Sequence, residues 1–144
     1  MLIERDELCH LIPHAGSMCL LNGVTEWDNE RIVCQAISHQ FSDNPLRCEQ
    51  GLSALQGIEY GAQAMAVHGG LLAREQGLVE APPGYLAAVR NVALHCDWLH
   101  LIDEPLKVEA AQLMSGAGSF IYEFELSSGE RVLLSGRATV MAVK

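Results

Sequence analysis

The longest helical pattern in the chain is Leu55-Gln-Gly-Ile-Glu-Tyr-Gly-Ala-Gln-Ala-Met-Ala-Val-His68. Apolar or small residues recur there, and just beyond it, at steps of three and four, the spacing of one helical face: Leu55, Ile58, Ala62, Met65, Gly69 and Leu72. Glu59 falls on the same predicted face. A carboxylate on a core-facing stripe costs free energy unless it is paired, hydrogen-bonded or protonated. Glu59 is therefore the best candidate for chemistry; the alternative is an edge glutamate that reaches water or bonds a loop amide.

Recognisable signals mark both ends of this predicted helix. Ser53-Ala-Leu-Gln56 matches a capping box, in which the serine hydroxyl and the glutamine side chain satisfy free amides. The pattern ends at about Arg74 or Gln76 and is closed by Gly77. The helix is rich in small residues, which lower helix propensity, so we expect another element to pack close to its backbone. These residues are Gly57, Gly61, Ala62, Ala64, Ala66, Gly69 and Gly70.

The flanking segments are mostly strand-like. Residues 1–12 are expected to form a short helix or turn, and residues 41–51 a polar loop. The predicted strands are residues 18–24 and 31–38, joined through residues 27–30, and then residues 85–94, 106–114, 119–127 and 131–143, with hairpin turns at 115–118 and 128–130. This order predicts an α+β fold in which a long antiparallel sheet wraps one central helix. We expect a single domain over residues 1–144.

Composition and charge exclude several classes of partner. No apolar run approaches the roughly 18 residues of a membrane helix, and the charged start argues against a signal peptide. The net charge of −9 repels nucleic acid and anionic lipid. An acidic carrier protein would need a local basic patch, for which the sequence offers Arg47, Arg74, Arg90, Lys107, Arg131 and Arg137.

The five cysteines are odd in number and widely scattered, without a C-x-x-C motif. Such a pattern is typical of reduced thiols in a cytoplasmic protein rather than of a disulfide framework. We therefore expect free cysteines and a cytoplasmic location.

Several local matches, in order, resemble the hotdog fold and, within it, the (3R)-hydroxyacyl-ACP dehydratases of bacterial fatty acid synthesis. Residues 11–24 (LIPHAGSMCLLNGV) are similar to their opening L-P-H-x-x-P-h-L-L-h-D-x-V segment. Residues 57–63 (GIEYGAQ) are similar to the helix that carries their catalytic acid, followed by A-Q. Residues 84–92 and 107–143 resemble their later strands. Residues 44–47 (NPLR), followed by residues 55–70, resemble most closely the dehydratase-like P proteins of aryl polyene gene clusters.

This resemblance implies a site as well as a fold. In these dehydratases a loop histidine removes the α-proton of the substrate, and an acid on the helix of the neighbouring subunit protonates the departing hydroxyl. Glu59 matches the acid. Ala54 and Leu55 match the region of the amides that polarise the thioester carbonyl, and Gln63 is a further expected substrate-binding residue. Asn44 stands where the catalytic histidine is expected, and an amide cannot accept a proton at neutral pH.

Other histidines do not replace the missing base. His68 lies nine residues after Glu59, about 180° around a helix, so the two side chains face opposite ways. We expect His68 to be a partly buried or interface residue. The groups Cys9, His10 and His14, and His95, Cys96 and His100, have spacings that could hold a metal, but neither reproduces a recognised zinc signature. We expect neither a metal nor a cofactor.

Three functions fit these observations. The first is a 3-hydroxyacyl-ACP dehydratase, or one subunit of a heterodimer whose partner, another hotdog dehydratase, supplies the histidine opposite Glu59. The second is a hotdog acyl-thioesterase, in which Glu59 acts as nucleophile or base on an acyl-CoA or acyl-ACP thioester. The third is a non-catalytic partner that stabilises another dehydratase. Dimerisation is expected in each case, because a lone sheet of this kind leaves an edge strand to pair.

Overall fold

A computed structural model describes residues 1–12, 18–78 and 84–142 of the chain. Its strands are β1 (Ile3–Glu4), β2 (Gly23–Trp27), β3 (Arg31–Ala36), β4 (Gly84–Leu94), β5 (Leu106–Gly116), β6 (Ser119–Ser128) and β7 (Arg131–Ala142). Its helices are α1 (Arg5–Cys9) and α2 (Gly57–Glu75), with short 3-10 turns η2 (Ser38–Gln40) and η3 (Ala54–Gln56).

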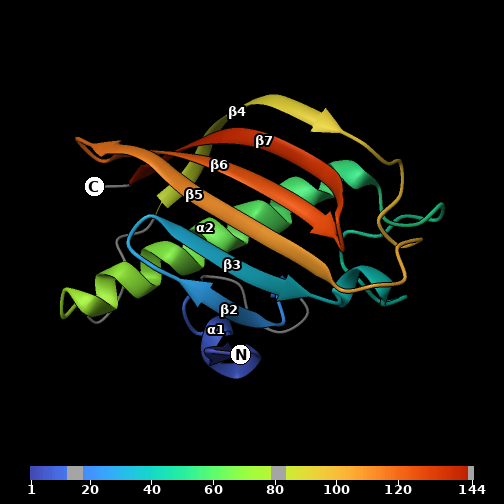
Figure 1. Cartoon of the computed structure of the whole chain (residues 1–144), viewed down its shortest axis with the longest axis horizontal. Helices are drawn as coiled ribbons and strands as arrows, with labels where there is room; N and C mark the ends of the chain where they lie inside the picture. The colour runs from blue at the N-terminus through green and yellow to red at the C-terminus, as the bar shows by residue number, and fades with distance from the viewer. Residues whose placement is uncertain (13–17, 79–83, 143–144) are drawn as a thin grey trace.

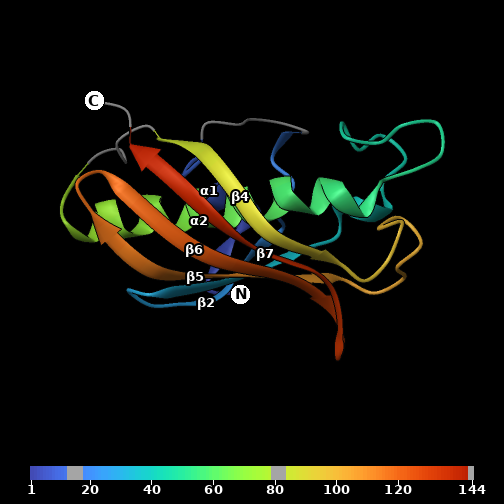
Figure 2. The ribbon, with the colours of Figure 1, turned by 90° about the horizontal axis from the view of Figure 1, so that it is seen from above.

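The seven strands form one antiparallel sheet in the order β1-β2-β3-β5-β6-β7-β4. Helix α2 crosses one face of the sheet and contacts β3, β5 and β6, its central strands (Figures 1 and 2). The hairpin between β5 and β6 turns through Ala117 and Gly118, both with positive φ, which suits the twist of the flanking strands. The expected α+β arrangement of a sheet around a central helix is confirmed.

The face that α2 turns toward the sheet differs from the predicted one. Its fully buried residues include Tyr60, Ala64, Val67 and His68, a face roughly a third of a turn away from the expected stripe. Of that stripe only Met65 is buried; Leu55 is exposed, and Ile58, Ala62, Gly69 and Leu72 are half-buried. The prediction of a core-facing stripe was therefore wrong in phase. The helix is apolar on two faces, and periodicity alone cannot tell which of them meets the sheet.

Two glycines explain how closely α2 approaches the sheet. A Cβ atom added at Gly61 would lie 2.7 Å from Cδ2 of Phe124, and one added at Gly57 would lie 2.5 Å from Cδ2 of Leu134. The expected close approach to the helix backbone is thus confirmed at these positions. At Gly69 an added Cβ meets nothing within 4 Å.

The surroundings of Gly61 and Gly69 predict opposite effects of a glycine-to-alanine substitution on the stability of the fold. Gly61→Ala is expected to lower the free energy of unfolding by about 1–3 kcal/mol, because the methyl group overpacks the buried Phe124 ring. Gly69→Ala, the matched control, is expected to raise it by up to about 1 kcal/mol, since alanine favours the helix and displaces nothing. Urea unfolding of the two variants measures the sign of each change in the free energy of unfolding. Equal effects would contradict this account of the packing.

The segment before β2 is not a strand, contrary to the prediction for residues 18–24. The strand begins at Gly23, and β1, which was not predicted, pairs with it. The backbone groups of Leu20 form hydrogen bonds with side chains. Its N–H donates to Gln63, and its carbonyl accepts from Ser38. Those bonds take the place of a strand ladder at Leu20, which accounts for the irregular course of the chain there.

A disulfide contradicts the prediction that all cysteines are reduced. Cys9 of α1 and Cys19 of the following segment are bonded, with Cα atoms 5.9 Å apart. No sequence pattern predicts this pairing, because it depends on how α1 and the segment that carries Cys19 lie in the folded chain. Cys34, Cys48 and Cys96 are free thiols. Within the described ranges, no helix is long and apolar enough to cross a membrane.

Strand β4 forms an open edge of the sheet. It is bonded only to β7, and it exposes large apolar side chains along its length: Tyr85, Leu86, Val92 and Leu94. An apolar edge strand of this length is a template for pairing with another chain.

Candidate active site

Glu59 lies in the first turn of α2, on a side of the helix turned away from the sheet. Its side chain is half-buried. Oε1 of Glu59 accepts a hydrogen bond from Nε2 of Gln63, one turn further along the helix, at 3.2 Å. The structure thus brings together two of the five predicted site residues. The carboxyl group of Glu59 and the amide of Gln63 therefore both come from α2.

Gln63 is buried, with only 2% of its surface exposed. Its Nε2 donates to the Met18 carbonyl at 2.7 Å, and its Oε1 accepts from the Leu20 amide at 2.9 Å. A buried amide with both ends bonded is the expected state of such a group. These bonds hold the segment before β2 against α2, beside Glu59.

Asn44 is buried within the loop between η2 and η3, and every polar atom of its side chain is bonded. Nδ2 donates to the Ser38 carbonyl at 2.9 Å and to the Tyr60 hydroxyl at 3.0 Å. Oδ1 accepts from the Leu46 amide at 2.9 Å. These bonds give Asn44 a structural role in the loop. The adjacent helix residues Tyr60 and Glu59 point about 100° apart, so Asn44 meets a different side of α2 from the one that carries the carboxyl.

A directed chain of hydrogen bonds nevertheless joins Asn44 to the segment beside Glu59. The hydroxyl of Ser38 donates to the Leu20 carbonyl at 2.7 Å, so its single proton is used. The Tyr60 hydroxyl, 2.8 Å away, must then donate to Ser38 Oγ. Burial raises the pKa of Tyr60, which keeps this donor protonated. The Leu20 amide in turn donates to Gln63, which donates to Glu59.

Ala54 and Leu55 lie in η3, immediately before α2. Their amides already have partners within the chain: Ala54 donates to the Asp97 carbonyl at 2.9 Å, and Leu55 to Ser53 Oγ at 3.3 Å. The Ser53 half of the predicted cap is thereby confirmed. A substrate carbonyl would have to displace one of these partners to bind here. The assignment of Ala54 and Leu55 to substrate binding remains a prediction.

His68 faces the sheet and lies on the opposite side of α2 from Glu59, as the helical geometry predicts. It is fully buried, with Nδ1 2.7 Å from the Tyr122 hydroxyl and Nε2 2.9 Å from the Asp28 carbonyl. Burial lowers the pKa of His68, so the ring is neutral at pH 7 and Nε2 donates to the carbonyl. This histidine is a structural residue of the core.

Three of the six residues considered for metal binding have other partners. Cys9 is in the disulfide, the His10 ring bonds the Asp6 carbonyl, and Nδ1 of His100 accepts from the Leu52 amide. His14 lies outside the described residues. Among residues 1–12, 18–78 and 84–142, no cluster of three or more histidine, cysteine or acidic side chains could hold a metal ion.

Neither of two cavities in the chain includes Glu59. One, of about 280 Å³, adjoins Leu20, Ser38 and Asn44. The other, of about 410 Å³, is lined by residues of β4, β5, β6 and β7, including Glu123 and Glu125. The carboxyl of Glu59 therefore belongs to neither cavity of the single chain.

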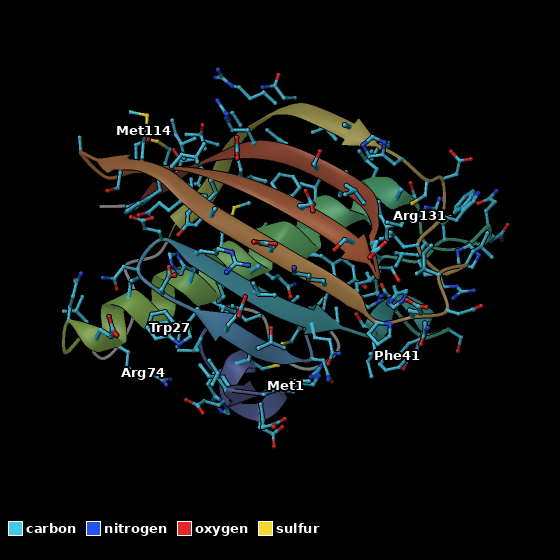
Figure 3. All side chains as sticks on the ribbon, viewed as in Figure 1. Met1, Trp27, Phe41, Arg74, Met114 and Arg131 are labelled. Carbon is cyan, nitrogen blue, oxygen red and sulfur yellow. A yellow bond between two sulfur atoms is a disulfide. The ribbon has the colours of Figure 1, made fainter. Side chains whose placement is uncertain are left out.

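The six cations considered as a basic patch do not form one. Three are paired with carboxylates: Arg74 with Glu7, Lys107 with Glu109 and Arg137 with Glu123. Figure 3 shows Arg74 and Arg131 at opposite ends of the molecule. Arg131 lies toward the end where α2 begins and donates to the His95 carbonyl.

Three parts of this network were not predicted from the sequence: Ser38, Tyr60 and the backbone of residues 18–20. One signal was present: Tyr60 lies within an apolar helix, and a buried tyrosine hydroxyl needs a partner. Its partners come from a loop and a 3-10 turn, whose approach to α2 the sequence does not reveal.

An antiparallel sheet wrapped around one long central helix is the arrangement of a hotdog protein. The profile of the ApeP-like family, described as ApeP dehydratase, matches residues 7–144. The chain therefore belongs to the ApeP-like dehydratase family, as its resemblance to the P proteins indicated.

Solved structures support the same fold. A chain of the dehydratase heterocomplex ApeI:P from Xenorhabdus doucetiae is 23% identical, with a TM-score of 0.84 over 95% of this chain and 91% of that chain. A mutant thioesterase enzyme from Staphylococcus aureus is 13% identical, with a TM-score of 0.63 over 84% and 92% of the two chains. A hypothetical thioesterase with coenzyme A from Streptococcus pneumoniae is 10% identical, with a TM-score of 0.62 over 83% and 84%. No curated protein matches the chain.

Proposed function

We propose that the chain is the acid-bearing subunit of a heterodimeric 3-hydroxyacyl-ACP dehydratase, acting in aryl polyene or fatty acid type synthesis. The observation that carries this proposal is the pairing of Glu59 with Gln63 on a half-buried helix face, while Asn44 is committed to the core. The described residues thus offer an acid in Glu59, whereas Asn44, at the position of the expected base, is bonded within its own loop and to Tyr60. Membership of the ApeP-like dehydratase family supports the reaction type.

The reaction needs one base and one acid on either side of the reacting carbons. A histidine of the partner takes the α-proton of the 3-hydroxyacyl thioester, and the C–O bond to the hydroxyl breaks. Protonated Glu59 gives its proton to the departing oxygen, so that water and an enoyl thioester are the products. Proton transfer of this kind contributes about 10²- to 10⁴-fold to the rate.

Two features of the chain support assembly with a second hotdog protein. Strand β4 leaves an apolar edge open, and α2 keeps an apolar face only half-covered. The heterocomplex found for the similar ApeI:P structure agrees with such a pairing. We place the chain in the cytoplasm, and Arg131, which lies toward the end of the molecule where α2 begins, is our candidate for contact with an acidic carrier.

The test measures enoyl-ACP formation from 3-hydroxyacyl-ACP by the chain alone, by a typical hotdog dehydratase from the same cells, and by the two together. We expect the mixture to exceed the sum of the two separate rates, and the chain alone by at least about 10²-fold, because the partner brings the histidine that the position of Asn44 does not supply. A partner whose loop histidine is replaced by alanine is the control and should abolish the gain. Full activity of the chain alone would contradict the proposal.

Measuring free thiol in the same reaction mixtures distinguishes the thioesterase alternative from dehydration. Free thiol released from acyl-ACP or acyl-CoA reports hydrolysis, whereas dehydration leaves the thioester intact. Steady thiol release that depends on Glu59 would assign the thioesterase function instead.

A further inference from the structure

The two cysteines of the disulfide differ in their accessibility. Cys9, on α1, is half-buried, whereas Cys19 has only 1% of its surface exposed. A disulfide is opened when a thiolate from outside reaches one of its sulfur atoms, so access decides which sulfur is attacked. The bond between Cys9 and Cys19 is therefore open to attack at Cys9.

The guanidinium of Arg5 lies beside this bond. Arg5 stands one turn before Cys9 on α1, and its Nη1 donates to Sγ of Cys9 at 3.4 Å. Its Nη2 donates to the Cys19 carbonyl at 2.8 Å. A cation beside a sulfur atom stabilises the thiolate that is released when a disulfide opens. Cys9 thus has the electropositive, partly exposed surroundings that are typical of cysteines in thiol exchange.

The three free cysteines have different surroundings. Cys34 is buried, and burial raises the pKa of its thiol to about 12. Burial also raises the pKa of Cys96. Both thiols are therefore protonated at pH 7 and poor nucleophiles. Cys48 is exposed and offers a control for any experiment on thiols.

The disulfide anchors a segment that belongs to the candidate site. Cys19 lies between Met18 and Leu20, whose backbone groups bond Gln63, and the Leu20 carbonyl accepts from Ser38. Cys19 and Leu20 also line the cavity of about 280 Å³. Because the cavity leaves one side of the segment loosely packed, the segment can shift once the bond that ties it to α1 is opened.

We propose that Cys9 and Cys19 form a redox-active pair, opened by a dithiol and closed by exchange with a disulfide compound, which releases and locks residues 18–20 at the candidate site. This inference goes beyond the proposed dehydratase reaction and does not depend on it. It also reconciles a disulfide with the cytoplasmic location that we propose, since cytosolic disulfides are usually transient or redox-sensing.

The exchange takes place in two steps. One thiolate of the dithiol attacks Sγ of Cys9, the S–S bond breaks, and its electron pair stays on the sulfur of Cys19, which takes a proton. The second thiolate of the dithiol then attacks the first, which closes the dithiol into a disulfide and releases the Cys9 thiolate beside Arg5. Two electrons pass from the dithiol to the pair. Of the dithiol's two protons, one goes to Cys19 and one to solvent.

The first test locates the exchange. The whole chain is treated with dithiothreitol in native buffer and then with iodoacetamide, and peptide mass spectrometry identifies the labelled cysteines. We expect Cys9 to be labelled after reduction and unlabelled before it, and oxidised glutathione to restore the bond. Cys48→Ser, which removes an exposed free thiol, is the matched control and should leave this response unchanged. A pair that opens only after urea has unfolded the chain would overturn the proposal.

The second test measures amide hydrogen exchange at Leu20 in the oxidised and the reduced chain. The bond joins residues ten positions apart, and we expect exchange at Leu20 to become about 10- to 100-fold faster when this constraint is lost. Amides of β6 should exchange alike in both forms, because the sheet is retained. Cys9→Ser should give the fast exchange with or without dithiothreitol. Equal exchange at Leu20 in the two forms, or faster exchange in β6 as well, would overturn the proposal.

Discussion

Glu59→Gln is expected to lower the kcat of the reconstituted dehydratase by about 10²- to 10⁴-fold. The amide has nearly the shape of the carboxyl group and can still accept from Gln63, so the local contact at 3.2 Å is preserved. What it cannot do is transfer a proton to a departing hydroxyl. We expect KM and the urea unfolding midpoint to change little, since Glu59 is only half-buried.

Glu75→Gln is the matched control for this experiment. It makes the same change of charge on the same helix, at its exposed last residue, and should leave kcat unchanged. Unaltered activity in Glu59→Gln, together with loss of activity when the whole chain is omitted, would show that the chain only stabilises its partner.

Asn44→Leu is expected to lower the free energy of unfolding by about 2–4 kcal/mol. Three hydrogen bonds are lost at a buried site, and the Tyr60 hydroxyl and the Leu46 amide are left without the partner they have now. Urea unfolding measures this loss. Asn22→Leu is the control: the Asn22 side chain is half-buried and makes no hydrogen bond to the described residues, and its replacement should cost less than about 1 kcal/mol.

A second substitution at Asn44 distinguishes a structural from a catalytic role of this position. Asn44→His restores the residue type of the family's base at the position nearest to it in sequence. We nevertheless expect no gain of dehydratase activity in the chain alone, because the side chain at this position is buried and bonded to Ser38 and Tyr60 of its own chain. Dehydration by Asn44→His at a rate well above that of the wild-type chain would show that the position does face the reacting carbons.

The central helix and the later strands could be predicted because local signals mark them. The helix ends at Glu75 and is closed by Gly77, whose φ of 79° suits glycine, as the sequence indicated. The four strands after residue 84 were found within one or two residues of their bounds among the described residues, since turns at Gly118 and Gly129 separate them. The segment of residues 18–22 was mistaken for a strand, because its partners are side chains from distant parts of the chain.

The residues of the candidate site likewise divide into those that local spacing predicts and those that depend on distant partners. The spacing of Glu59 from Gln63 can be read from the sequence, since four residues bring two side chains together on one helix. The expected core-facing position of Glu59 was wrong, because its stripe is not the face of α2 that meets the sheet. The role of Asn44 could not be read in this way. Its bonds to Ser38 and Tyr60 exist only when the loop, η2 and α2 meet.

By itself the sequence determined the central helix, the place of Glu59 in its first turn and the strands that follow this helix, because each depends on neighbours along the chain. Only the tertiary structure decided which face of α2 is buried, that Cys9 and Cys19 pair, and that Asn44 serves the core. Those outcomes depend on contacts between segments far apart in sequence, and a helix apolar on two sides is compatible with either packing.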